Sequence, residues 1–76
     1  MSKVPRITAA KLIKVLLRKR FLFTRQEGSH KIYRNPDGVR ATVPDHAGKT
    51  IHPKIIKTIL VDTGWSLEEF ISALKG

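Results

Sequence analysis

Residues 25–33 read RQEGSHKIY, and this stretch decides the fold. Its first part, Gln26 to Ser29, has the composition of a turn. The run that follows, His30 to Arg34, is rich in β-prone residues, as is the run Phe21 to Arg25 that precedes the turn. The stretch therefore predicts a β-hairpin in which His30 comes directly after the turn.

A second turn and a third strand follow along the chain. Asn35-Pro36-Asp37-Gly38 is a strong turn signal. Val39 to Val43 then alternates apolar and polar residues, which is typical of a half-buried strand, and Pro44 is expected to end the sheet. Two tight turns in series predict a three-stranded antiparallel meander.

Helices are predicted before and after this meander in the sequence. Apolar residues recur at helical spacing from Ala9 to Lys19, after Thr8 as a candidate N-cap. Pro53 suits the first position of a second helix that ends at Gly64, and Ser66 begins a capping box for a last helix. The predicted order is α-β-β-β-α-α, an α+β fold in one domain over residues 1–76, with helices covering one face of the sheet.

Charge is the strongest signal in the composition. Fifteen Lys and Arg residues against six Asp and Glu residues give a net charge of +9 in 76 residues. Such a balance predicts a polyanionic partner, which is a nucleic acid, an acidic protein or an anionic membrane surface. The chain has no cysteine and no apolar run long enough to span a bilayer, so we expect a cytoplasmic protein without membrane contact.

Several segments together resemble the HicA family of toxins. The resemblance begins with Leu16-Leu17 and Phe21 and continues through residues 25–33. It then follows the order Asp37-Gly38, Thr42-Val43-Pro44, His46 and Ile55 to Leu74, and so covers Ala10 to Leu74. One departure is Arg20, which stands where the family commonly has a glycine, at the expected C-terminal cap of the first helix.

The resemblance implies a fold like that of double-stranded-RNA-binding domains. It implies a ribosome-independent endoribonuclease that cleaves mRNA without a metal or other cofactor, with RNA and not DNA alone as its nucleic acid. It also implies a cognate HicB-like antitoxin that holds the toxin inactive. The histidine of the family's Gly-Ser-His triplet corresponds to His30, which the resemblance makes the catalytic residue.

The chemistry of RNA cleavage suggests further site residues. A neutral imidazole can move the proton of the 2′-hydroxyl group, and His46 or Lys31 are candidates for the second proton transfer. Candidates for contact with the substrate are Gly28, Ser29, Lys31, Arg25, Arg34 and Lys54, with Lys57 one turn further along the same helix. For each of them an ordinary structural role is the alternative: His30 as the first residue of a strand, Gly28 as a turn residue, and the lysines as a solvated helix face.

Tyr33 is a further candidate, because an exposed aromatic ring can stack on bases. Strict alternation places Tyr33 and Lys31 on one face of the sheet and Ile32 on the other. If Ile32 faces the helices, Tyr33 faces the RNA and His30 lies on the helix side.

Two other functions remain open. The domain could bind RNA without cleaving it, or its basic surface could serve to bind an acidic protein. The spacing of His30, His46 and His52 is not that of metal ligands, so no metal site is predicted.

Overall fold

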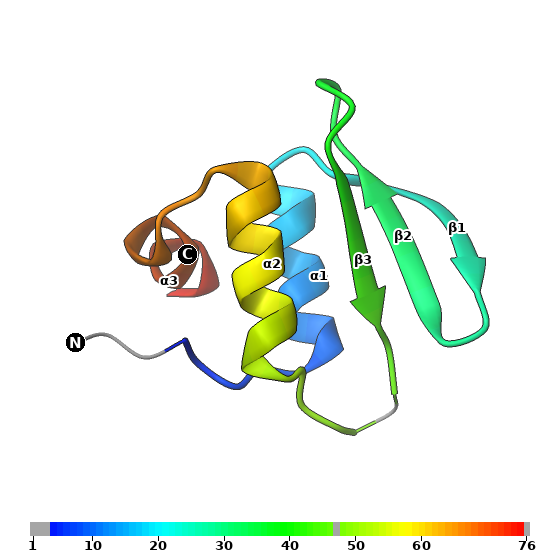
Figure 1. Ribbon diagram of the computed structural model, residues 1–76, viewed down its shortest axis with the longest axis horizontal. Helices are drawn as coiled ribbons and strands as arrows, with labels where there is room; N and C mark the ends of the chain where they lie inside the picture. Colours follow the sequence, from blue (N-terminus) through cyan, green and yellow to red (C-terminus); the bar gives the residue numbers. More distant parts are fainter. Residues whose placement is uncertain (1–3, 47, 76) are drawn as a thin grey trace.

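The computed structural model describes residues 4–46 and 48–75. Its elements are α1 (Ala9–Arg18), β1 (Leu22–Glu27), β2 (His30–Arg34), β3 (Arg40–Pro44), α2 (Pro53–Thr63) and α3 (Leu67–Lys75). The predicted α-β-β-β-α-α order is confirmed (Figure 1). Residues 1–3, Ala47 and Gly76 lie outside the described residues.

The three strands form one antiparallel sheet in the order β1-β2-β3. The first turn consists of two residues, Gly28 and Ser29, and Gly28 has a φ of +60°. In the second turn the Asn35 side-chain oxygen accepts a hydrogen bond of 2.8 Å from the backbone N–H of Val39. The sheet is thus the predicted meander, and Pro44 is the last residue of β3.

Strand β1 is longer than predicted and irregular. It begins one residue after Phe21 and reaches Glu27, and its pairing with β2 shifts between Phe23 and Arg25. Thr24 is therefore the extra residue of a β-bulge. All six residues of β1 are exposed, because β1 is an edge strand and lies farthest from the helices (Figure 1).

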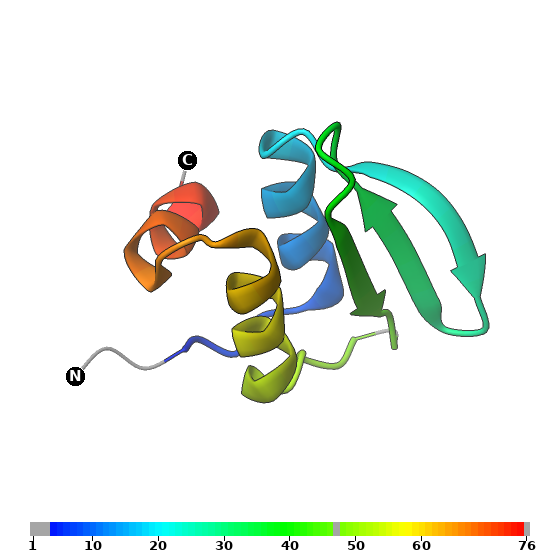
Figure 2. The same ribbon diagram turned by 45° about the horizontal axis from the view of Figure 1, so that its top comes forward.

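Helices α1 and α2 lie beside β3, and α3 packs against α1 on the side away from the sheet (Figures 1 and 2). The hydrophobic core lies between the helices and the sheet. The core residues are Ile7, Ala9, Leu12, Val15, Leu16, Phe21, Tyr33, Ala41, Val43, Ile51, Ile56, Ile59 and Phe70. Alternation in β3 directs Ala41 and Val43 into this core and leaves the residues between them on the other face. The result is the predicted α+β fold, like that of double-stranded-RNA-binding domains.

The end of α1 explains why Phe21 precedes the strand. The N–H groups of Arg20 and Phe21 donate hydrogen bonds of 3.2 and 2.9 Å to the carbonyl oxygens of Leu17 and Leu16. This is the Schellman pattern, which requires a left-handed residue between the helix and the next hydrophobic residue. Arg20 takes that conformation, with a φ of 69°, and is the one residue other than glycine with positive φ in the described chain.

The other helix caps follow the predictions. The N-cap of α2 is His52, whose Nδ1 accepts a hydrogen bond of 3.0 Å from the N–H of Lys54. Gly64 ends α2 with a φ of 77°. Before α3 the Ser66 hydroxyl accepts a hydrogen bond of 3.0 Å from the Glu69 N–H. Trp65, between these two helices, packs edge-on against Phe21 with 5.6 Å between the ring centroids.

Candidate functional site

The hairpin turn fixes the position of His30. Glu27 and His30 are the last paired residues on either side of the turn, and His30 also pairs with Pro44 of β3. The His30 backbone therefore lies in the central strand, held on both sides. Its side chain is exposed, so the imidazole is accessible although its backbone is fixed.

The register of the sheet shows which residues share a face with His30. Side chains two residues apart in a strand point the same way, and residues paired across strands share a face. The "His30 face" of the sheet therefore consists of Leu22, Arg25, Glu27, His30, Ile32, Arg34, Arg40, Thr42 and Pro44. It carries three arginines and a single carboxylate, and that carboxylate is paired with Arg25 at 2.7 Å.

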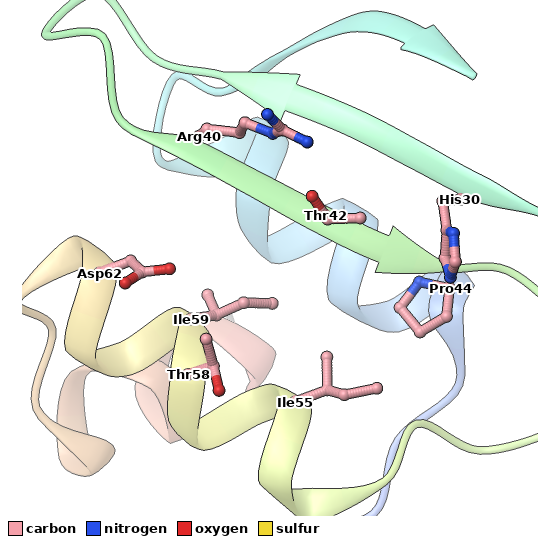
Figure 3. Close-up of a pocket in the computed structure, with 8 residues that line it drawn as sticks. All are labelled: His30, Arg40, Thr42, Pro44, Ile55, Thr58, Ile59 and Asp62. Carbon is pink, nitrogen blue, oxygen red and sulfur yellow. The ribbon is translucent and has the colours of Figure 1, made fainter. Parts of the chain in front are cut away.

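A groove of about 390 Å³ lies where the His30 face meets α2 (Figure 3). We call it the β3–α2 groove. It is lined by His30, Arg40, Thr42, Pro44, Ile55, Thr58, Ile59 and Asp62. Its volume falls within the range of small-molecule sites, which is roughly 300–1,000 Å³. The groove is therefore large enough to receive part of a nucleotide.

The two ends of the groove differ in chemistry. His30 lies beside Pro44 at one end, whereas Arg40 and Asp62 lie at the other (Figure 3). The walls between them combine Thr42 and the isoleucines of α2. Because Arg40 and Pro44 are four residues apart in β3, the two ends are separated by about 13 Å of strand.

Lys31 lies on the opposite face of the sheet from His30. Its ammonium group is 2.7 Å from a carboxylate oxygen of Asp45, whose N–H donates a hydrogen bond of 2.7 Å to the Ser29 carbonyl oxygen. The hydrogen bond and the charge of Asp45 raise the pKa of Lys31. This predicted phosphate ligand and candidate proton donor is thus engaged in an ion pair at the base of the turn.

Tyr33 does not face solvent. The sequence would have placed it there if Ile32 had faced the helices. Its side chain belongs to the core and is 5% exposed, whereas Ile32 is buried on the His30 face. Its ring packs edge-on against Phe23 at 5.7 Å, and burial raises the pKa of its phenol. The ring therefore has no free face on which a base could stack.

The remaining predicted residues lie around the groove without lining it. Gly28 and Ser29 form the turn before His30, and Arg34 is exposed on the His30 face. Lys54 precedes Thr58 by one turn of α2, on the strip that borders the groove, whereas Lys57 faces away from that strip. His46 is exposed in the loop after β3. Of all the predicted site residues, only His30, the predicted catalytic residue, lines the groove itself.

Several groove residues had not been identified as site candidates from the sequence. The sequence could have indicated Arg40 and Thr42, since they are the polar residues that alternate with Ala41 and Val43. The indication for Thr58 and Asp62 is weaker, because it is only a four-residue spacing that places them on one helix face. Nothing in the sequence indicated that these two pairs face each other, because that depends on how α2 packs beside β3.

Two further observations concern the kind of site. Within residues 4–46 and 48–75, no group of three or more His, Cys, Asp or Glu side chains is arranged to hold a metal ion. In the same residues no helix has both the length and the apolar character needed to cross a membrane.

The chain matches a model of a known protein family. A family model described as "HicA toxin of bacterial toxin-antitoxin" matches residues 9–65. The chain belongs to the HicA toxin family. The matched residues extend from the start of α1 to Trp65 and so include every residue of the β3–α2 groove. A comparison with curated proteins finds no match.

Proposed function

We propose that this HicA toxin is an endoribonuclease that cleaves mRNA, with His30 as general acid/base. The observation that carries the proposal is the position of His30. Its exposed imidazole lies at one end of a groove, on a sheet face with three arginines. Imidazole changes its protonation state near neutral pH, so it can move protons under cellular conditions.

The proposed reaction is a transesterification that uses the RNA's own nucleophile. His30 removes the proton of a 2′-hydroxyl group, and the 2′-oxygen forms a bond to the adjacent phosphorus atom. The bond from phosphorus to the 5′-oxygen breaks, and that oxygen takes up a proton from water, while the protonated His30 returns its proton to the solvent. The products are a 2′,3′-cyclic phosphate and a free 5′-hydroxyl group. DNA lacks the 2′-hydroxyl group, which restricts the reaction to RNA.

The arginines of the His30 face supply phosphate binding in this proposal. Arg34 is exposed, and among the described residues it forms no ion pair, so its guanidinium is available to a phosphate. Arg25 forms an ion pair with Glu27, so it supplies less net positive charge to a phosphate than Arg34 does. Contacts of this kind depend on the backbone of the RNA and position the strand without reading its sequence.

The protein belongs to a toxin–antitoxin family, and the proposed antitoxin is HicB-like. We expect this partner to cover the His30 face with an acidic segment, because the face is basic and the chain carries a net charge of +9. An inhibited complex in which His30 stays fully open to solvent would contradict this mode of inhibition.

The decisive test is cleavage of an mRNA transcript in EDTA by the wild type and by His30→Ala. We expect cleavage by the wild type and a loss of at least about a hundredfold in the variant, the usual contribution of general acid/base catalysis. His52→Asn is the matched control, since asparagine also caps helices and His52 does not line the groove.

The other outcomes of this assay are equally informative. If cleavage survives in His30→Ala with its fold intact by circular dichroism, another residue is the catalyst, and His46→Ala is the next variant to examine. If neither protein cleaves but both bind RNA, the domain is a non-catalytic RNA-binding module.

A further inference from the structure

The β3–α2 groove continues beyond His30, and its far end differs from a phosphate-binding surface. Asp62 lies there with an exposed side chain, and it forms no ion pair with any of the described residues. A carboxylate repels phosphate, so this end of the groove suits an uncharged group with N–H donors.

The two walls of the groove present opposite hydrogen-bonding groups. On α2 the Thr58 hydroxyl donates its proton to the Lys54 carbonyl oxygen at 3.0 Å and points away from β3 (Figure 3), so it offers no group to the groove. Asp62, one turn further on, only accepts. On β3 the Arg40 guanidinium only donates. A matching ligand must direct donors toward α2 and acceptors toward β3.

We propose that the groove is a base-recognition subsite for a guanine next to the cleaved phosphate. The inference rests on the proposed function, because it places the scissile phosphate at His30. Guanine has two adjacent N–H donors, N1–H and the N2 amino group, which match the two oxygens of Asp62. Its O6 and N7 acceptors match Arg40, the pairing that arginine commonly makes with this base. Adenine, cytosine and uracil each lack this pair of adjacent donors.

The middle of the groove fits the body of a base. Ile55 and Ile59 line it on the α2 side and point toward β3, between the charged end and the His30 end (Figure 3). Apolar side chains of this kind favour the flat faces of a base over its charged backbone. About 13 Å of strand separates His30 from the Arg40 and Asp62 end.

The first experiment maps the bonds that the wild type cleaves in an mRNA transcript. We expect guanine to be enriched by about tenfold at one of the two positions that flank the cleaved bond. In Asp62→Asn the guanine enrichment should disappear and adenine should rise, since asparagine pairs with the N6 and N7 groups of adenine. Glu68→Gln removes an exposed carboxylate from α3 and is the control that should keep the wild-type pattern.

A second measurement does not depend on cleavage. Amide chemical shifts are followed in the wild type while guanosine, adenosine, cytidine or uridine monophosphate is added. We expect the guanosine nucleotide to shift the amides of the groove at the lowest concentration, and Asp62→Asn to weaken this binding about tenfold. Selective guanosine binding without any cleavage would overturn the proposed catalysis but support the subsite. Cleavage without base preference, or a preference that survives in Asp62→Asn, would overturn the subsite alone.

Discussion

Arg34 and Arg40 lie directly opposite each other in the β2–β3 ladder, with both side chains on the His30 face. Like charges in such a cross-strand pair destabilise a sheet. Neither guanidinium forms an ion pair within residues 4–46 and 48–75. The arrangement therefore has a cost in the free protein that a bound polyanion would remove.

Replacing one arginine of this pair should separate stability from RNA binding. We expect Arg34→Gln to raise the free energy of unfolding by about 0.5 kcal/mol at low salt, because the repulsion is relieved. The same change should weaken RNA binding and reduce the slope of log affinity against log salt by about 1. Urea unfolding and salt-dependent binding measure the two effects. Lys75→Gln, at the end of α3, is the charge-matched control, and an equal effect there would mean that only net charge matters.

Gly28 should be required because its backbone has a positive φ, and not because a larger side chain would lack space. Gly28 has a φ of +60°, and a Cβ atom there would have no heavy atom within 4 Å. We expect Gly28→Ala to lower the free energy of unfolding by about 1 kcal/mol, the strain of a left-handed residue. Asparagine tolerates this conformation better, so Gly28→Asn should lose less. Equal losses in urea unfolding would show that the two variants disturb something other than φ.

The departure at Arg20 predicts a stabilising substitution. Arg20 adopts a left-handed φ of 69° within the Schellman motif, where the HicA family commonly has glycine. We expect Arg20→Gly to raise the free energy of unfolding by about 0.5–1 kcal/mol, because glycine has no Cβ to strain. Lys14→Gly, in the exposed middle of α1, is the control and should destabilise by about 1 kcal/mol. Destabilisation by both would contradict the cap geometry.

Tyr33 should make the protein less stable at alkaline pH. Burial raises its pKa in the folded protein above the ordinary value of about 10, which the unfolded chain retains. The contribution of Tyr33 to the free energy of unfolding is therefore complete at pH values below its ordinary pKa. It is lost as the pH rises above that pKa, because the unfolded chain then releases the phenol proton more readily than the folded protein does. Tyr33 is the only tyrosine, so tyrosinate absorbance reports its titration directly. In Tyr33→Phe the alkaline loss of stability should be smaller, and an unchanged loss would assign it elsewhere.

Much of the fold could be predicted because local patterns determine it. The helices follow from apolar spacing and from caps such as Thr8, Gly64 and Ser66, and the meander follows from its two turns. The β-prone run Phe21 to Arg25 predicts that Phe21 belongs to the first strand. It is instead the hydrophobic residue that completes the cap of α1, a role that depends on the conformation of Arg20.

The candidate site could be predicted only in part. Alternation shows that Tyr33 and Ile32 point to opposite faces, but which face is covered depends on where the helices pack. The presence of Arg40 and Asp62 at the same end of the groove has the same origin, since the two residues are 22 positions apart in the sequence. His30 was singled out because the resemblance to the HicA family gives the catalytic role to the histidine of the Gly-Ser-His triplet, and that role stays a prediction.

The meander also has a consequence for how quickly the toxin forms. Each strand pairs with its neighbour in the chain through a short turn, so the sheet depends on contacts that are close in sequence. Domains with such local contacts fold faster than those that join distant segments. We therefore expect the sheet to form early in folding. Control of the toxin would then rest on its antitoxin and not on slow formation of the sheet.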